Sequence, residues 1–469
     1  MMTSAPPLTS TADLRGRRVV VLGLARSGVA AARMLAHAGA RVTAYDRRHA
    51  SELAGAIAAL DGLGVRTVPT ATPAEVQALL ASAELVVTSP SISARFPTTD
   101  EWLRRALSDA QANGTPVLGE VDLFLSLTRA RVLAVTGTKG KTTTVALLGS
   151  ILEAAQMPHA VGGNIGTPLI ERVDELGADT WAVLELSELQ LPSIPRGAEV
   201  AVYTNIAADH LDRHGTVEAY RAVKARLAQL TVGSGTVVLN ADDPGCRELG
   251  ATLDGSLRWY GLDEDGLDAG SDGLHLMLAG SPLLAVADVP LPGRHMLGNA
   301  LGAILGAAEA GVPREAIAAG VRGFRGVPHR LETVATHRGV RYVNDSQATI
   351  PMAALAALDA FADAPLVLIA GGQGKGLEYA ELADRIAQRA RVAVLLGETA
   401  DELERLIAGR LTVRRASDMD EAVELATQAA RPGEVVLLSP AATSFDMFTD
   451  YAARGDAFRA AVNRLTEAS

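Results

Sequence analysis

The chain is almost free of cysteine, has no excess of basic residues and contains no long apolar run. Its single cysteine, Cys246, excludes a fold held together by disulfide bonds. The formal net charge of −11 disfavours a nucleic-acid backbone or an anionic membrane as a partner, because both require a basic surface. No apolar stretch approaches the ~18 residues that span a bilayer, so membrane insertion is not expected. These absences predict a cytoplasmic protein that binds neither nucleic acid nor membrane.

The most informative motif that is present lies at 134–144. An apolar strand leads there into a glycine-spaced turn, followed by Lys-Thr at the start of a helix expected over 143–155. In this arrangement backbone N–H groups and the positive end of the helix face an anion, which is how proteins hold nucleotide phosphates. Lys141 would reach the β- and γ-phosphates, and the Thr142 hydroxyl would ligate Mg2+. The loop is short, because Val135 stands where the general pattern has its first glycine.

Short apolar strands alternate with helical stretches along the rest of the chain, which is typical of parallel α/β sheets. A length of 469 residues suggests about three domains. The expected fold class is therefore α/β in three domains. They are an N-terminal Rossmann-like parallel sheet at 1–120, a central P-loop ATPase-type α/β domain at 121–327 and a C-terminal Rossmann-like α/β domain at 328–469. In the first domain we expect strands at 18–22, 41–45, 85–88 and 116–118.

The first strand is followed by Gly23-x-Ala25-x-x-Gly28, and Asp46 ends the second. This is the order of a dinucleotide-binding fold, with alanine in place of the middle glycine. Because Ala25 would hinder the close approach of a pyrophosphate, a nicotinamide cofactor is the weaker interpretation. Another nucleotide or a UDP-sugar at this turn is the better one.

Polar groups in the middle of the chain complement the phosphate loop. Glu185 ends a strand of the predicted sheet, where a carboxylate is placed to hold Mg2+. His210 lies between Asp209 and Asp212 just past the next strand, which favours a ligand role over a structural one. Lys224, on the helix that follows, would by its local sequence be an ordinary surface lysine.

Eight motifs occur in one order over nearly the whole chain and together resemble those of the Mur ligases, which couple ATP hydrolysis to amide-bond formation. The segment 438–446 is similar to the pattern of the ligases that add D-glutamate to UDP-N-acetylmuramoyl-L-alanine. The Asp-Asn-Pro-Arg signature of ligases for diaminopimelate or lysine is absent. The eight motifs are Gly-Thr-Lys-Gly-Lys-Thr-Thr at 137–143, Gly-Asn-Ile-Gly at 163–166, Glu-Leu-Ser at 185–187, Asp-His-Leu-Asp-Arg at 209–213 with Lys224, Leu-Asn-Ala-Asp-Asp at 239–243, Gly-x-His-x-x-x-Asn at 293–299, His-Arg-Leu-Glu at 329–332 and Asn-Asp-Ser-x-Ala-Thr at 344–349.

The resemblance implies a set of site residues. ATP would be bound by Gly137, Thr138, Lys139, Gly140, Lys141, Thr142, Thr143, Asn299, Arg330 and Asp345. Mg2+ would be held by Thr142, Glu185 and His210, with a carbamylated Lys224 as a further anionic partner; Lys141, Glu185, His210 and Lys224 would be catalytic. The UDP portion would contact Asp46, Arg47 and Ser89, the muramoyl end Asn164 and Ser187, and the incoming D-glutamate Thr349, Lys375, Ser444 and Tyr451.

The implied substrates are ATP, D-glutamate and UDP-N-acetylmuramoyl-L-alanine, handled by a monomer. Two alternatives stay open: another Mur-type amino-acid ligase, and a P-loop ATPase that acts as a conformational switch without ligase activity. The chain also departs from the family pattern at five positions, which are Lys139, Glu188, Met296, Gln347 and Gln373. The effects of these departures are not set by the sequence.

Overall fold

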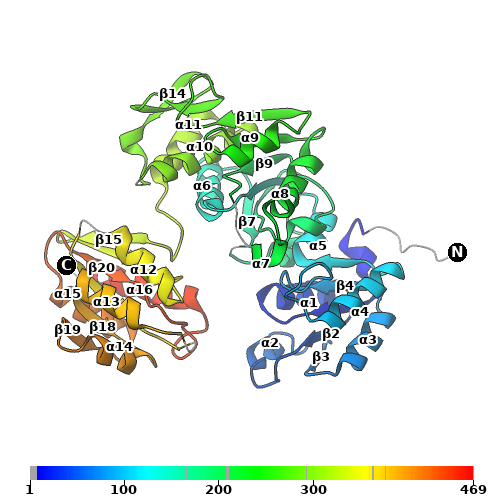
Figure 1. Ribbon diagram of the computed structural model, residues 1–469, viewed down its shortest axis with the longest axis horizontal. Coiled ribbons are helices and arrows are strands. Elements are labelled where there is room, and N and C mark those ends of the chain that lie inside the picture. Colours follow the sequence, from blue (N-terminus) through cyan, green and yellow to red (C-terminus); the bar gives the residue numbers. More distant parts are fainter. Residues whose placement is uncertain are drawn as a thin grey trace. The chain divides into compact units, whose positions relative to one another are not determined.

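The computed structural model describes residues 8–164, 166–207, 211–291, 293–361, 364–374 and 377–467, without the side chains of residues 211 and 212. The chain forms two compact units, Met1–Phe324 and Arg325–Ser469. The first unit contains two sheets and the second contains one, so the described chain has a three-domain α/β fold (Figure 1). None of the described helices is both long and apolar enough to cross a membrane.

The N-terminal sheet has five parallel strands in the order β3-β2-β1-β4-β5. Alternate residues of β1 join two different apolar clusters, one on each face, so both faces of the sheet are covered. The strand order reverses between β1 and β4, where ligands of such sheets bind beyond the carboxyl ends of the strands. The elements are η1 (Thr11–Leu14), β1 (Arg18–Leu22), α1 (Arg26–His37), β2 (Arg41–Asp46), α2 (Ala54–Ala58), β3 (Arg66–Pro69), α3 (Pro73–Ser82), β4 (Leu85–Thr88), α4 (Glu101–Ala112), β5 (Val117–Gly119) and α5 (Glu120–Leu127).

All four predicted strands of this domain are present, with ends shifted by one residue at most. The prediction missed β3, because its short sequence Arg-Thr-Val-Pro ends in a proline and carries only one large apolar residue.

The central sheet has nine strands in the order β14-β13-β12-β11-β10-β9-β6-β8-β7, antiparallel only from β12 to β14. Its apolar core is continuous with that of the N-terminal sheet, which explains why the two sheets form one unit. The elements are β6 (Arg131–Thr136), α6 (Lys141–Ala154), β7 (His159–Gly163), η2 (Leu169–Arg172), β8 (Trp181–Glu185), η3 (Leu191–Ser193), β9 (Val200–Tyr203), α7 (Leu211–His214), α8 (Val217–Thr231), β10 (Thr236–Asn240), α9 (Pro244–Gly250), β11 (Ser256–Tyr260), β12 (Ala269–Ser271), β13 (His275–Leu278), β14 (Ser281–Ala285), η4 (Val286–Asp288), α10 (Arg294–Glu309) and α11 (Arg314–Gly323).

The C-terminal unit has six strands in the order β15-β16-β20-β17-β18-β19, all parallel except the edge strand β15. Two apolar clusters cover the two faces of this sheet. The elements are β15 (Glu332–His337), β16 (Val340–Asn344), α12 (Pro351–Ala360), β17 (Leu366–Ala370), α13 (Ala380–Arg389), β18 (Ala390–Leu395), α14 (Ala400–Ile407), β19 (Thr412–Arg415), α15 (Met419–Ala429), β20 (Val435–Leu438) and α16 (Tyr451–Glu467).

Candidate active site

Gly137 and Gly140 shape the turn between β6 and α6. Both have positive backbone φ angles, +150° and +87°. An added Cβ would lie 2.0 Å from Thr204 Oγ1 at Gly137 and 2.2 Å from Asn299 Oδ1 at Gly140, so a larger residue does not fit at either position. Asn299, on α10, is thereby brought against the loop, and its amide lies 3.7 Å from the sulfur of Met296. The two glycines let the backbone turn tightly enough to surround an anion.

The ammonium group of Lys141 lies within this turn. Its Nζ donates to the carbonyl oxygens of Gly137 at 2.9 Å and of Thr138 at 3.0 Å. Lys141 is also the first residue of α6, and the buried Thr143 follows in its first turn. The first N–H groups of the helix, which have no acceptor within the helix itself, and the partial positive charge of the helix N-terminus therefore act at the same place as the ammonium group. This combination fits the phosphates of a nucleotide.

Two loop residues tie the turn to the segment that follows β9. Thr138 Oγ1 donates to the Ala207 carbonyl at 3.1 Å and lies 3.0 Å from the Tyr220 hydroxyl. The N–H of Lys139 donates to Asn205 Oδ1 at 2.9 Å. The phosphate loop is thus fixed to the segment that leads toward the predicted ligand at 210.

Thr142 and Glu185 form the oxygen-rich part of the site. Thr142 Oγ1 donates to Glu185 Oε2 at 2.7 Å, and Glu185 is only 2% exposed at the end of β8. A hydroxyl and a carboxylate beside a phosphate-binding helix end are ligands that Mg2+ prefers, so these residues fit that ion. The other predicted ligand, His210, lies outside the described residues, and within them no group of three or more His, Cys, Asp or Glu side chains could hold a metal.

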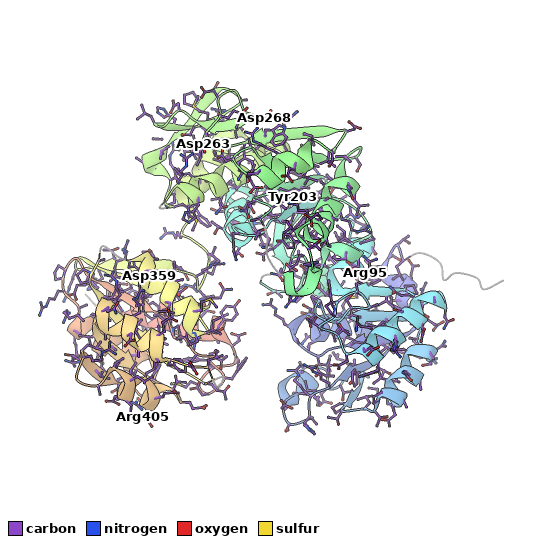
Figure 2. The ribbon with its side chains drawn as sticks, in the orientation of Figure 1. Arg95, Tyr203, Asp263, Asp268, Asp359 and Arg405 are labelled. Carbon is purple, nitrogen blue, oxygen red and sulfur yellow. The ribbon has the colours of Figure 1, made fainter. Side chains whose placement is uncertain are left out.

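Lys224 is not a surface lysine, as its local sequence suggested, but is fully buried. Its Nζ donates to Thr136 Oγ1 at 3.2 Å and to the Gly137 carbonyl at 3.0 Å. The hydroxyl of Tyr203, a residue labelled in Figure 2, donates to the Lys224 carbonyl at 2.7 Å and accepts from the Ala228 N–H at 2.8 Å, which ties α8 to the end of β9. The local sequence failed because the tertiary packing of α8, and not its own pattern, decides which face is covered.

The residues predicted for the muramoyl end lie beside this cluster. Asn164 Nδ2 donates to Glu185 Oε1 at 2.8 Å. The N–H and the hydroxyl of Ser187 both donate to Gln190 Oε1 at 2.9 Å. Asn164 and Glu185 are thus brought together, while the donor groups of Ser187 are engaged with its own loop.

In the N-terminal sheet, the carboxylate of Asp46, one of the predicted UDP contacts, is bound by Arg48. The Asp46 carboxylate accepts from the Leu24 N–H at 2.7 Å and from Arg48 Nε and Nη2 at 3.0 and 2.8 Å. Burial alone would raise the pKa of Asp46, but the hydrogen bonds from Arg48 and Leu24 outweigh it and lower the pKa to about 2. Sequence reasoning did not name Arg48, because nothing in the local sequence sets it apart from the adjacent Arg47.

A cavity of about 370 Å3 opens beside this aspartate and is lined by the N-terminal sheet and by two residues of the central domain. The predicted Asp46, Arg47 and Ser89 all lie on its wall, together with Arg213. Arg213 forms an ion pair with the buried Glu188 at 3.5 Å. Glu188, one of the positions that depart from the family pattern, thus places a negative charge next to the arginine of this cavity.

In the C-terminal unit, Arg330 and Asp345 line a pocket of about 350 Å3 together with Gln347. Asp345 accepts from Ser439 Oγ at 2.9 Å and from the Leu331 N–H at 3.2 Å. Burial raises the pKa of Asp345 to about 6, although the hydrogen bond from Ser439 acts against it. The structure therefore brings these two predicted nucleotide contacts together.

The predicted amino-acid contacts lie beyond the carboxyl ends of the strands in the same unit. Ser444, in the loop after β20, is 2% exposed, Thr349 follows β16, and Tyr451 begins α16. The fourth of them, Lys375, lies outside the described residues. Sequence reasoning missed Arg454, which is buried among these loops and looks like any other arginine of a helix.

Comparison with protein families gives three matches in chain order. Residues 17–119 match the family described as "Mur ligase MurD-like, N-terminal domain". Residues 135–307 match "Mur ligase middle domain", and residues 329–442 match "Mur ligase, glutamate ligase domain".

Curated relatives match along almost the whole chain. The UDP-N-acetylmuramoylalanine–D-glutamate ligase of Solibacter usitatus is 40% identical over 455 residues, which is 96% of this chain and 99% of that protein. The ligase of the same name from Symbiobacterium thermophilum is 39% identical over 461 residues, covering 96% and 98%. Among solved structures, the UDP-N-acetylmuramate-alanine ligase of Thermotoga maritima has a TM-score of 0.56 at 18% identity, covering 97% of this chain and 100% of that one. This last similarity concerns the fold alone.

Proposed function

This chain belongs to the Mur ligase family, and we propose that it is an ATP-dependent ligase that adds D-glutamate to UDP-N-acetylmuramoyl-L-alanine in cytoplasmic peptidoglycan precursor synthesis. The curated relatives that match its full length carry the name of this activity. The observation in the structure that carries the proposal is the arrangement of Lys141, Thr142 and Glu185 at the N-terminus of α6. This arrangement supports a phosphoryl transfer, which is the first step of the proposed reaction.

The reaction proceeds in two steps. The terminal carboxylate of the UDP-sugar substrate attacks the γ-phosphate of ATP, which forms an acyl phosphate and releases ADP. The amine of D-glutamate then attacks the activated carbonyl and phosphate leaves, so that one amide bond forms for each ATP consumed.

In the first step Lys141 and the N–H groups at the start of α6 stabilise the charge that develops on the transferring phosphoryl group. Thr142 and Glu185 would hold Mg2+, with His210 as the further proposed ligand. When bound, Mg2+ supplies positive charge that offsets the same developing negative charge. Asp46, Arg47 and Ser89 orient the UDP end in the 370 Å3 cavity, while Arg330 and Asp345 contact the nucleotide. Thr349, Lys375, Ser444 and Tyr451 hold the glutamate.

We further propose that Lys224 is carbamylated in the active enzyme. An unmodified lysine puts a positive charge next to a site for a divalent cation, which is unfavourable. In its neutral form the amine of Lys224, which is fully buried beside Gly137, would react with CO2 to give an anionic carbamate and a proton. The chain contains only four lysines, Lys139, Lys141, Lys224 and Lys375. Carbamylation with ¹³C-labelled CO2 should therefore give a single carbonyl resonance that is lost in Lys224→Arg; a resonance that persists in the variant would refute the assignment.

The proposed domain limits are 1–120, 121–327 and 328–469, and we propose that the enzyme works as a cytoplasmic monomer. Each domain supplies one part of the substrate set: the UDP portion, ATP and the amino acid. Sedimentation across a tenfold range of concentration should give one species with the mass of a single chain.

Phosphate release from ATP tests the proposed function. It should require UDP-N-acetylmuramoyl-L-alanine and D-glutamate together, and L-glutamate, L-alanine, lysine and meso-diaminopimelate should not replace D-glutamate. Equal release with another amino acid would assign the chain to a different Mur-type ligase. Release without any amino acid would favour the conformational-switch ATPase instead.

A further inference from the structure

Arg454 is a buried cation whose hydrogen-bond partners are all neutral. It lies in the first turn of α16 and is 2% exposed. Its Nε donates to Ser346 Oγ at 3.0 Å and its Nη2 to the Ser346 carbonyl at 2.9 Å. Its Nη1 donates to the carbonyls of Ala442 and Thr443 at 3.0 and 3.1 Å. Within the described part of the chain Arg454 forms no ion pair, so its direct hydrogen-bond partners offset its charge only with their dipoles.

Keeping a charge at this place is costly. Moving a cation out of water carries a penalty of several kcal/mol that hydrogen bonds to carbonyls offset only in part. Burial lowers the pKa of Arg454 to about 10, and the nearby Asp446 only partly opposes this, so the guanidinium is still charged at neutral pH. A cation kept at such a cost needs a role beyond packing.

The guanidinium lies where three loops meet, after β16, β17 and β20. Gly372 in the β17 loop packs so closely that an added Cβ would lie 3.0 Å from Arg454 Nη1 and 2.2 Å from the Thr443 oxygen. Gln373 and Thr443 exchange backbone hydrogen bonds of 2.8 and 3.0 Å. The proposed amino-acid contacts Thr349 and Ser444 belong to two of these loops, those after β16 and β20. Arg454 therefore organises the backbone that would carry them.

The effect of Arg454 reaches the peptide between Thr443 and Ser444. In a planar trans peptide the C=O and the following N–H point in opposite directions. Because the Thr443 carbonyl faces the guanidinium, the Ser444 N–H faces away from it, and among the described residues that N–H makes no hydrogen bond. A cation bound at the carbonyl polarises the peptide and makes its N–H a stronger donor.

We propose that Arg454 is the positioning residue of the amino-acid site: it orients the Thr443–Ser444 peptide so that the Ser444 N–H binds a carboxylate of the incoming amino acid, and its charge favours an anionic substrate. The inference rests on the proposed function, in which that amino acid is D-glutamate. It explains why the unpaired cation is fixed beneath this loop.

The test compares Arg454→Met and Arg454→Lys with a matched control on the same helix. The control is Arg459→Met, since Arg459 Nη2 pairs with the Glu332 carboxylate at 2.9 Å and so has an ordinary structural role. Arg454→Met should raise the KM for D-glutamate by about tenfold or more, because the substrate carboxylate loses one strengthened hydrogen bond. The KM for ATP should stay within about twofold of the wild-type value. Arg454→Lys should lie between wild type and Arg454→Met, and Arg459→Met should change neither KM.

Amide hydrogen exchange over residues 439–447 gives a second readout that needs no substrate. The Thr443 amide, which donates to the Gln373 carbonyl at 3.0 Å, should lose protection and exchange faster in both Arg454 variants, and it should exchange at the wild-type rate in Arg459→Met. An unchanged KM for D-glutamate in a folded Arg454→Met would refute the inference, and if that variant does not fold, an unchanged KM in Arg454→Lys does so. If wild type itself shows no D-glutamate-dependent release, the proposed function fails, and unchanged exchange at Thr443 would then also remove the positioning role.

Discussion

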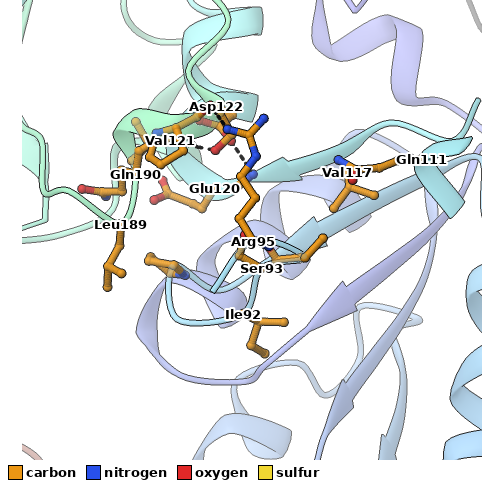
Figure 3. A pocket seen from close by; sticks show the side chains of 16 residues that line it. Ile92, Ser93, Arg95, Gln111, Val117, Glu120, Val121, Asp122, Leu189 and Gln190 are labelled. Carbon is orange, nitrogen blue, oxygen red and sulfur yellow. Dashed lines mark hydrogen bonds between the residues drawn. The ribbon is translucent and has the colours of Figure 1, made fainter. Parts of the chain in front are cut away.

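Glu120 offers the sharpest test of how the first unit is held together. It begins α5, the helix that leads from the N-terminal sheet into the central domain, and is 3% exposed. It lines a cavity of about 70 Å3 together with Arg95, which donates to the Pro192 carbonyl at 3.0 Å (Figure 3). Among the described residues, Oε2 of Glu120 has no hydrogen-bond partner. Replacing it by glutamine keeps the shape and removes the ionisable proton.

Burial raises the pKa of Glu120 from its ordinary 4.5 to about 8, with the Asp122 carboxyl acting in the same direction and a hydrogen bond from Ile170 acting against it. Below pH 4.5 the group is protonated in both the folded and the unfolded chain, so it does not make the free energy of unfolding depend on pH. Between pH 4.5 and 8 the unfolded chain loses this proton while the folded chain keeps it, so stability falls as pH rises. Above pH 8 the group is ionised in both states, and the free energy of unfolding falls no further on its account.

The size of the effect follows from the two pKa values. They differ by about 3.5, and each pKa unit corresponds to ~1.36 kcal/mol, which gives an upper limit of about 5 kcal/mol. Burying the glutamine amide without a hydrogen-bond partner costs roughly 1 to 3 kcal/mol, which reduces the stability gained by the substitution. At pH 8.5 Glu120→Gln should therefore be more stable than wild type by roughly 2 to 4 kcal/mol.

Urea unfolding at pH 5, 6.5 and 8.5 measures this difference. The stability advantage of Glu120→Gln should grow steadily with pH. The control is Glu84→Gln, which removes the carboxylate of an exposed ion pair with Arg18 and should change stability by less than ~1 kcal/mol at every pH. A Glu120→Gln advantage that is absent, or equal at pH 5 and 8.5, would show that Glu120 is ionised in the folded protein and would refute the reasoning.

Three further predictions concern the phosphate loop. Lys141→Ala should lower kcat for phosphate release by at least ~10³-fold while the fold, followed by circular dichroism, is kept, because it removes charge at the transferring phosphoryl group; near-normal turnover would contradict the assignment. Gly140→Ala should raise the KM for ATP and cost about 1 to 2 kcal/mol of stability in urea, since the new Cβ meets Asn299 at 2.2 Å in a left-handed turn; wild-type values for both would show that the turn is not under this constraint. Lys224→Ala should be inactive and partly rescued by short carboxylic acids that replace the carbamate, whereas full activity in bicarbonate-free buffer would exclude the carbamate.

The sequence predicts the phosphate loop well because its requirements are local. A tight turn needs glycine at 137 and 140, and a helix end needs Lys-Thr directly after it. The same locality predicts the more apolar strands of the N-terminal sheet, and it fails for β3, whose sequence Arg-Thr-Val-Pro has only one large apolar residue.

The misses share a different cause. The burial of Lys224 depends on how α8 packs against the ends of β6 and β9, which lie far from it in sequence. Arg454 gains its place from three loops that only the folded sheet brings together. In both cases the decisive contacts are long-range, and no local pattern encodes them.

The most direct test of the account follows one oxygen atom. UDP-N-acetylmuramoyl-L-alanine with ¹⁸O in its terminal carboxylate is incubated with the protein, ATP, Mg2+ and D-glutamate, and the products are analysed by mass spectrometry. The acyl-phosphate mechanism predicts a nucleotide product extended by one glutamyl residue and inorganic phosphate that carries one ¹⁸O. The carboxylate oxygen that attacks the γ-phosphate stays with the phosphate when the amine displaces it from the carbonyl carbon. Phosphate free of ¹⁸O, or ATP hydrolysis without the glutamyl product, would contradict the central claim that this chain joins D-glutamate to the UDP-sugar through an acyl phosphate.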